Sequence, residues 1–233
     1  MGKGLFVIGT GTDVGKTYIT ALLSKKLQES GAKTAYYKAA MSGNARGADG
    51  RLLAGDALFV KQTAALSQPV QSMCPYVYEH AYSPHLAAKL EGNPVELDIV
   101  QQGYAALSEQ HSYVTVEGSG GIVCPIRFDE QKIGLEDIVR GLGLPCLLVA
   151  DAGLGTINSV VLTAFYLWAH HIPVQGIVLN RFHPDSVLEQ DNRKMCEALT
   201  GLPVLACVQP DETEIPISLQ ALTALYENTD LIS

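Results

Sequence analysis

Short runs of apolar and β-branched residues alternate along the chain with longer stretches of helical periodicity. The short runs predict strands at residues 5–8, 34–37, 113–116, 146–150, 174–179 and 204–208. The longer stretches predict helices at residues 18–30, 56–66, 84–90, 97–110, 135–141, 157–169 and 186–199. Strands that alternate with helices in this way form parallel βαβ units. The pattern therefore predicts a doubly wound α/β fold, with a mostly parallel sheet and helices on both of its faces.

Composition and charge narrow the class of protein. A length of 233 residues suits one α/β domain over residues 1–233, and 47% hydrophobic residues provide material for a core. The net charge of −8 disfavours a nucleic-acid partner, which would require clustered Lys and Arg. We find no secretory signal and no apolar run of membrane-spanning length, so we expect a cytoplasmic protein without a membrane partner. The five cysteines form no CxxC pair, which favours reduced core cysteines over a zinc site.

Residues 9–17 read Gly-Thr-Gly-Thr-Asp-Val-Gly-Lys-Thr and lie between a predicted strand and a predicted helix. Glycines let the backbone turn its N–H groups inward, and a helix N-terminus adds partial positive charge where phosphate oxygens would lie. Lys16 would reach the β- and γ-phosphates of ATP, and the Thr17 hydroxyl would be a ligand of Mg²⁺. The loop therefore predicts a nucleotide-binding P-loop. The alternative is a Gly-rich turn that holds no nucleotide.

The spacing within this loop departs from the common one. The usual P-loop has four residues between its first glycine and the Gly-Lys pair, whereas Gly9 leaves five and Gly11 leaves three. A subfamily of P-loops explains this spacing better than the absence of a nucleotide site.

The loop and a series of shorter motifs resemble the dethiobiotin synthetases. The matching segments, in chain order, are Gly9-Thr10-x-Thr12-x-Val14-Gly15-Lys16-Thr17, Tyr37-Lys38-x-x-x-Ser42-Gly43, Gly55-Asp56-Ala57, Ser83-Pro84-His85, Val116-Glu117-Gly118-x-Gly120-Gly121, Leu154-Gly155-x-Ile157-Asn158 and Leu179-Asn180-Arg181. Most of these matches are weak singly, but together and in order they are specific. The resemblance implies an ATP-dependent ligase that joins diaminopelargonate and CO₂ into dethiobiotin, with Mg²⁺ as cofactor and a homodimer as the assembly.

The resemblance also implies a role for individual residues. It makes Lys38 and Lys16 catalytic, and it makes Thr17, Asp56 and Glu117 the magnesium ligands. It places the nucleotide on Asp13, Val14, Gly15, Lys16, Thr17, Tyr18, Asp56, Glu117, Gly118, Ser119, Gly120, Asn180, Arg181, Pro210 and Asp211. It places the substrate on Thr12 and Ser42, and on Gly155, Thr156 and Asn158 of the partner subunit.

Several of these residues have a structural alternative. Lys38 could be a solvated lysine at a strand end, and Asp56 could cap the helix that follows it. Glu117 comes directly after a strand of apolar and β-branched residues. It is therefore either a metal ligand or a buried charge without a partner, which would be energetically costly. The helix at residues 157–169 is apolar on most faces, which suits either the core or a dimer contact.

Two functions of other kinds stay open at this point. One is a nucleotide-switch ATPase of the chromosome-partition type, although residues 9–12 lack the second lysine of that class. The other is an amidoligase-type domain of cobalamin synthesis, which would need a glutaminase domain. The chain also departs from the dethiobiotin synthetase pattern at Gly11, where an acid is usual, and at Ala39, where a proline is usual.

Overall fold

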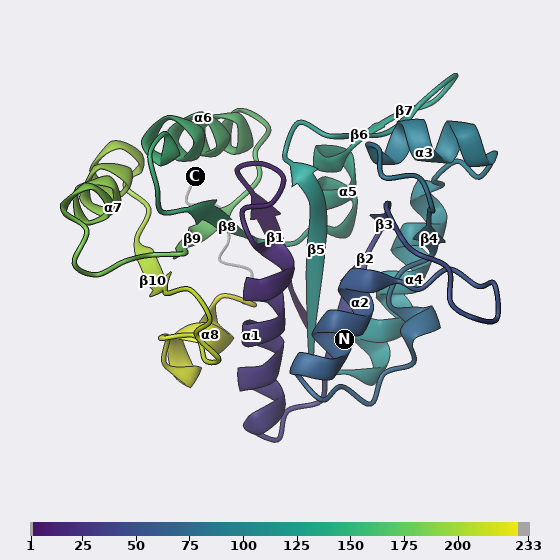
Figure 1. Ribbon diagram of the computed structural model, residues 1–233, viewed down its shortest axis with the longest axis horizontal. Helices are drawn as coiled ribbons and strands as arrows, with labels where there is room; N and C mark the ends of the chain where they lie inside the picture. Colours follow the sequence, from purple (N-terminus) through teal and green to yellow (C-terminus); the bar gives the residue numbers. More distant parts are fainter. Residues whose placement is uncertain (1, 228–233) are drawn as a thin grey trace.

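The computed structural model describes residues 2–227, and its centre is a six-stranded parallel sheet (Figure 1). The strands of this sheet are β1 (Lys3–Gly9), β2 (Thr34–Lys38), β5 (Tyr113–Gly121), β8 (Cys146–Asp151), β9 (Val174–Asn180) and β10 (Val204–Val208). They are arranged in the order β10-β9-β8-β1-β5-β2, and every pair in that order is parallel. The chain thus winds outward on both sides of β1, which confirms the predicted doubly wound α/β fold.

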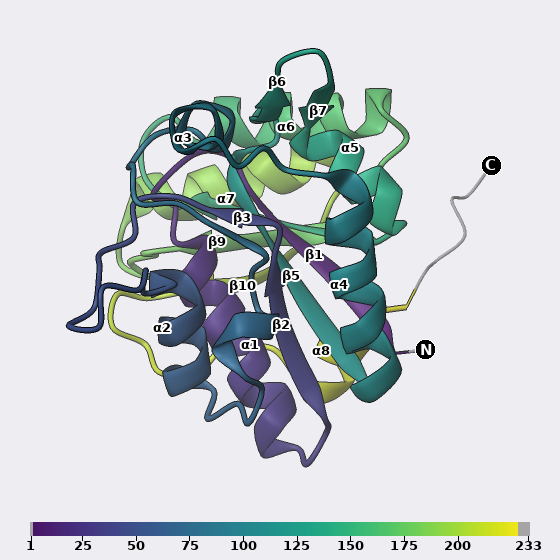
Figure 2. The ribbon, with the colours of Figure 1, turned by 90° about the vertical axis from the view of Figure 1, so that its right-hand side faces the viewer.

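Helices cover both faces of this sheet. They are α1 (Lys16–Glu29), α2 (Gly55–Thr63), α3 (Pro84–Glu91), α4 (Leu97–Gln110), α5 (Leu135–Leu142), α6 (Thr156–Ala169), α7 (Val187–Thr200) and α8 (Leu219–Ala224). Figure 2 shows α1 and α2 on one side of β2 and α4 on the other. Burial on both faces is the reason that the strands read as continuous apolar runs instead of alternating ones.

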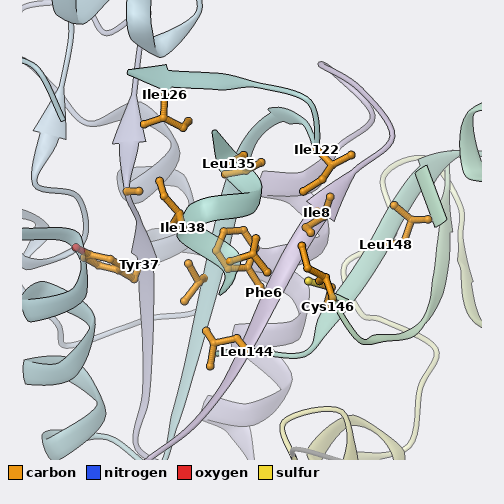
Figure 3. Packing of buried hydrophobic residues seen from close by; sticks show 14 of the residues in the cluster. Phe6, Ile8, Tyr37, Ile122, Ile126, Leu135, Ile138, Leu144, Cys146 and Leu148 are labelled. Atoms are coloured by element: carbon orange, nitrogen blue, oxygen red, sulfur yellow. The ribbon is translucent and has the colours of Figure 1, made fainter. Parts of the chain in front are cut away.

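Alternate residues of β1 belong to two separate hydrophobic clusters. Leu5 and Val7 pack with residues of α1 and α8. Phe6 and Ile8 pack in the larger cluster on the opposite face, together with residues of α3 to α7. Figure 3 shows Phe6 inside this cluster, with Ile138 of α5 among its neighbours. Successive side chains of a strand point to opposite faces, so one short apolar run supplies both cores.

Some short elements were not expected from the sequence. They are β3 (Ala40–Met41), β4 (Tyr76–Val77), β6 (Pro125–Phe128), β7 (Lys132–Gly134), a 3₁₀ turn (Val70–Ser72) and α8. Most of them are too short to give a hydrophobic period. Strand β5 also extends beyond the predicted end at residue 116, because Gly121 still pairs with Gly9 of β1.

The five cysteines are all unpaired, as expected, and Cys74, Cys146 and Cys196 are buried. Within residues 2–227, no three His, Cys, Asp or Glu side chains gather as a metal-binding group. None of the helices described in that range has both the length and the apolar character needed to cross a membrane.

Candidate active site

The predicted phosphate loop lies at the carboxyl edge of the sheet, between β1 and α1 (Figure 1). Here β1 lies between β5 and β8, with Gly9 opposite Gly121 on one side and Val149 on the other. A cavity of about 710 Å³ opens at this edge. Its lining residues are Thr12, Asp13, Gly15, Lys16, Thr17, Tyr18, Lys38, Ala40, Met41, Ser42, Asp56, Phe59, Glu117, Ser119, Gly120 and Arg181. Parallel α/β sheets bind ligands at such an edge.

The backbone of the loop has the form of an anion site. Among the described residues, the N–H groups of residues 11–15 donate to no protein acceptor. Gly15 has a φ of 93°, a conformation that favours glycine, and helix α1 begins directly after it. Free N–H groups at a helix N-terminus favour a phosphate oxygen. The loop is therefore chemically suited to a nucleotide phosphate.

The last residue of β9 and the residue after it hold this loop in place. Asn180 Nδ2 donates to the carbonyl of Val14 over 3.0 Å. Arg181 donates to the carbonyl of Asp13 over 2.8 Å and forms an ion pair of 2.7 Å with Asp151. A Cβ added to Gly15 would lie 2.0 Å from Asn180 Nδ2, so this contact also requires glycine. Two successive carbonyls are thus fixed, which determines how the peptide groups of the loop are turned.

The two predicted catalytic lysines are both buried. Lys16 is 7% exposed, and its Nζ donates to the carbonyl of Gly11 over 2.8 Å. Burial lowers the pKa of Lys16, and the charge of Glu117 opposes this effect. Lys38, at the end of β2, pairs in register with Glu117 of β5. Its Nζ lies 2.7 Å from Glu117 Oε1 and 2.6 Å from Asp56 Oδ2.

The charges around Lys38 form one buried cluster. Glu117 is 1% exposed, so it would be a costly group without a cation. Burial by itself would lower the pKa of Lys38, but the charges of Glu117 and Asp56 and their hydrogen bonds raise it above its ordinary value. Lys38 is therefore fully protonated at neutral pH, and the alternative of a solvated strand-end lysine does not fit its burial.

The predicted magnesium ligands meet in this cluster. The Thr17 hydroxyl donates to Glu117 Oε1 over 2.8 Å, and the same oxygen accepts from Lys38. Asp56 reaches Lys38 from the first turn of α2. Hydroxyl and carboxylate oxygens are the ligands that Mg²⁺ prefers in proteins. Because Asp56 and Glu117 already hold one cation and the Thr17 hydroxyl adjoins the same oxygen of Glu117, the residues present fit a magnesium ion.

Only some of the other predicted site residues line the cavity. Thr12, Ser42, Ser119 and Gly120 line it, whereas Val14, Gly118 and Asn180 are not part of its lining. Pro210 and Asp211 are exposed after β10. The Tyr18 hydroxyl donates to the carbonyl of Glu212, which ties that segment to α1. Gly155, Thr156 and Asn158 lie at the N-terminus of α6 and do not line the cavity.

Sequence reasoning missed Tyr36 and Phe59. The Tyr36 hydroxyl donates to Glu117 Oε2 over 2.9 Å. Burial raises the pKa of Tyr36 well above its ordinary value, and the charge of Glu117 adds to the effect. A signal for Tyr36 existed, because it stands two residues before Lys38 and therefore shares its side of the strand. Phe59 lines the cavity one helical turn after Asp56, and an exposed residue on a short helix gives no such signal.

Known proteins resemble the chain over almost its whole length. A family model described as "AAA domain" matches residues 3–216. The ATP-dependent dethiobiotin synthetase of Brachyspira hyodysenteriae is 47% identical over 209 residues, which cover 89% of this chain and 92% of that protein. The protein of that name from Clostridium botulinum (strain Eklund 17B) is 42% identical over 227 residues, which cover 97% of this chain and 99% of that protein.

Solved structures resemble the fold at low sequence identity. Chloroplast FtsY from Physcomitrella patens has a TM-score of 0.54 at 16% identity, covering 98% of this chain and 66% of that one. The signal recognition particle 54 kDa protein from Aeropyrum pernix has a TM-score of 0.55 at 13% identity, covering 96% of this chain and 48% of that one. The chain thus spans about half to two thirds of these structures. At such identities the likeness concerns the fold alone.

We expect Lys38→Met to destabilise the protein in metal-free buffer, because buried Glu117 loses its cation. Breaking a buried ion pair costs about 3 kcal/mol, which lowers the melting temperature by about 6–12 °C in a chain of this size. Mg²⁺ should restore most of the loss in the variant and change the wild type little. Calorimetry with and without Mg²⁺ measures both effects.

The control is Lys3→Met, which breaks an exposed ion pair with Glu227 and should change the melting temperature little. A loss that Mg²⁺ does not reverse would contradict the metal site.

We expect Gly15→Ala to weaken ATP binding, because its backbone has a φ of 93° and the added Cβ would meet Asn180. Strain of this kind should lower the affinity about tenfold or more. The matched control is Gly11→Ala, since a Cβ there would meet no atom within 4 Å. Titration calorimetry with ATP compares the two variants. Equal affinities would show that the conformation of Gly15 does not determine nucleotide binding.

Proposed function

Because the chain belongs to the ATP-dependent dethiobiotin synthetase family, we propose that it converts 7,8-diaminopelargonic acid, CO₂ and ATP into dethiobiotin, ADP and phosphate. The reaction is a step of biotin synthesis. One amine of the substrate adds to CO₂ and loses a proton, which gives a carbamate. A carbamate oxygen then attacks the γ-phosphorus, and ADP leaves. The second amine attacks the carbonyl carbon of the resulting carbamic-phosphoric anhydride, which expels phosphate and closes the ureido ring.

One observation carries the proposal: the candidate phosphate loop, the buried lysines Lys16 and Lys38, and the carboxylates of Asp56 and Glu117 line the same cavity. The carbamate, the γ-phosphate and the oxyanion formed during ring closure are all negative. Preorganised cations in a site of low dielectric stabilise such charge as it develops. Lys16 and Lys38 approach the cavity from α1 and β2, so one can face the phosphates while the other faces the carbamate.

Thr17, Asp56 and Glu117 are the residues that would hold Mg²⁺. When bound with the nucleotide, the ion would neutralise phosphate charge and orient the γ-phosphate. Asp56 and Glu117 would then have a second cation and would no longer require the ammonium of Lys38. We propose that Lys38 turns from these carboxylates toward the carbamate, where it stabilises the attacking group.

Other residues of the site would orient the two substrates. The Nδ2 group of Asn180 is held by Val14, which leaves Oδ1 as the acceptor for the amino group of adenine. Pro210 and Asp211 would line the other side of the base. The hydroxyl groups of Thr12 and Ser42 would accept hydrogen bonds from the amines of the substrate and donate hydrogen bonds to the carbamate.

We expect the purified protein to form dethiobiotin from diaminopelargonate, bicarbonate and MgATP, and Lys38→Met to lose turnover while it still binds ATP. Mass spectrometry of the product and ATP titration at saturating Mg²⁺ measure the two properties. Because Lys38 acts on the developing charge, its loss should lower kcat far more than it raises the Kd for ATP. Failure of the wild type to form dethiobiotin would overturn the proposed function. Weak ATP binding by a variant with normal kcat would assign Lys38 to nucleotide binding.

We further propose that two copies of the chain associate through α6. Asn158, Leu162, Phe165 and Ala169 succeed one another at intervals of four, three and four residues, so they share one face of the helix. On this exposed face, Leu162 is 62% exposed and Phe165 56%. The N-terminus of the same helix carries Gly155, Thr156 and Asn158, which could bind the substrate carboxylate in the other subunit. Large apolar side chains exposed side by side on one helix face are typical of an interface.

We expect Phe165→Glu to convert a dimer into a monomer, because it places a charge in the apolar contact. Sedimentation equilibrium measures the change in mass. Ile99→Glu, on the exposed side of α4, is the matched control and should leave the mass unchanged. A Phe165→Glu variant that remains dimeric would exclude this face of α6 as the interface.

A further inference from the structure

Tyr36 is a buried residue of β2 for which the proposed reaction gives no role. Its side chain is 0% exposed, and its hydroxyl donates to Glu117 Oε2 over 2.9 Å. Strand β2 pairs with β5 so that Tyr36 lies opposite Thr115 and Lys38 lies opposite Glu117. The register therefore brings two side chains of β2 to one carboxylate of β5.

The two oxygens of Glu117 have different partners. Oε1 accepts from Thr17 over 2.8 Å and from Lys38 over 2.7 Å, so it faces the candidate magnesium site. Oε2 accepts from Tyr36. A carboxylate is planar, so a donor that holds Oε2 also determines where Oε1 points. Without that donor, Oε2 would be a buried charged oxygen with no partner, and the side chain would rotate to find one.

Tyr36 is itself held in position at the edge of the sheet. Within residues 2–227, β2 is the last strand of the sheet, so no described strand of the sheet lies beside its outer edge. The side chain of Gln68, which is 3% exposed, supplies hydrogen bonds at this edge in place of a neighbouring strand. Its Oε1 accepts from the N–H of Tyr36 over 2.9 Å, and its Nε2 donates to the carbonyl of Tyr36 over 3.0 Å. Gln68 therefore fixes the backbone from which the hydroxyl reaches Glu117.

We propose that Tyr36 is a positioning residue of the active site: its hydroxyl holds Glu117 Oε2, so that Oε1 faces the divalent cation. This role rests on the proposed function only in that Glu117 is taken as a metal ligand. Hydrogen-bond partners behind a metal ligand orient it, and their loss typically weakens metal binding about 10–100-fold. Tyr36 touches neither the substrate nor the reacting atoms, so its effect passes through Glu117.

The test compares Tyr36→Phe with Tyr37→Phe. Tyr37 is the next residue of the same strand, is 1% exposed, and donates its hydroxyl to the carbonyl of Val100 over 2.9 Å. Both variants lose one buried hydroxyl and one hydrogen bond, but only Tyr36 contacts Glu117. The probe is Mn²⁺ in the presence of a non-hydrolysable ATP analogue, and electron paramagnetic resonance measures the free ion.

We expect Tyr36→Phe to weaken Mn²⁺ binding about tenfold or more, and Tyr37→Phe to leave it within twofold of the wild type. Melting temperatures should fall by similar amounts, which separates the metal effect from lost stability. In steady-state kinetics, Tyr36→Phe should need more Mg²⁺ for half-maximal rate while the KM for diaminopelargonate stays unchanged.

Two outcomes would overturn the proposal. One is wild-type Mn²⁺ affinity in folded Tyr36→Phe, and the other is an equal loss of affinity in Tyr37→Phe. The Mn²⁺ measurement needs no diaminopelargonate and no turnover. Absence of dethiobiotin formation would therefore overturn the proposed function but not the role of Tyr36. Wild-type Mn²⁺ affinity in Tyr36→Phe would overturn the role of Tyr36 but not the proposed function.

Discussion

The buried ion pair between Lys38 and Glu117 is the constraint on which the site depends. Neither charge can be buried alone without a large desolvation cost. Strand pairing places them in register at the carboxyl edge of β2 and β5, and their atoms come within 2.7 Å. A cation must therefore remain at this point of the fold. Asp56 also holds the ammonium of Lys38, and Thr17 donates to the oxygen of Glu117 that holds it. These carboxylate and hydroxyl oxygens are suited to Mg²⁺.

The phosphate loop is held from the opposite side by residues of β9 and the turn after it. Asn180 and Arg181 bind two successive carbonyls of the loop, while Lys16 bends back to the carbonyl of Gly11. These contacts fix the peptide groups before any phosphate binds. A preorganised site has less reorganisation to undergo as charge develops during a reaction. The end of β9 thus links the segment proposed to hold the base to the candidate phosphate loop.

Much of the fold could be predicted from the sequence, because hydrophobic periodicity reports burial directly. The long helices and the six strands of the sheet coincide with predicted elements, and the Gly-rich loop lies between β1 and α1 as expected. The short pairs β3–β4 and β6–β7 could not be predicted, since strands of two to four residues have no measurable period. The helix at Leu219–Ala224 was also missed, because six residues give less than two turns of pattern.

The sequence by itself determined which chemical groups are present and at which edge of the sheet they lie. The resemblance to the dethiobiotin synthetases identified Lys38, Glu117 and Asn180, and each lies at or directly after the end of a predicted strand, which in a parallel sheet is the carboxyl edge. Only the tertiary structure decided which groups touch. The order of the strands places β2 beside β5, and this order depends on crossover connections that no local pattern records. For that reason the ion pair of Lys38, the hydrogen bond from Tyr36 to Glu117 and the contact of Asn180 with Gly15 emerged only from the fold.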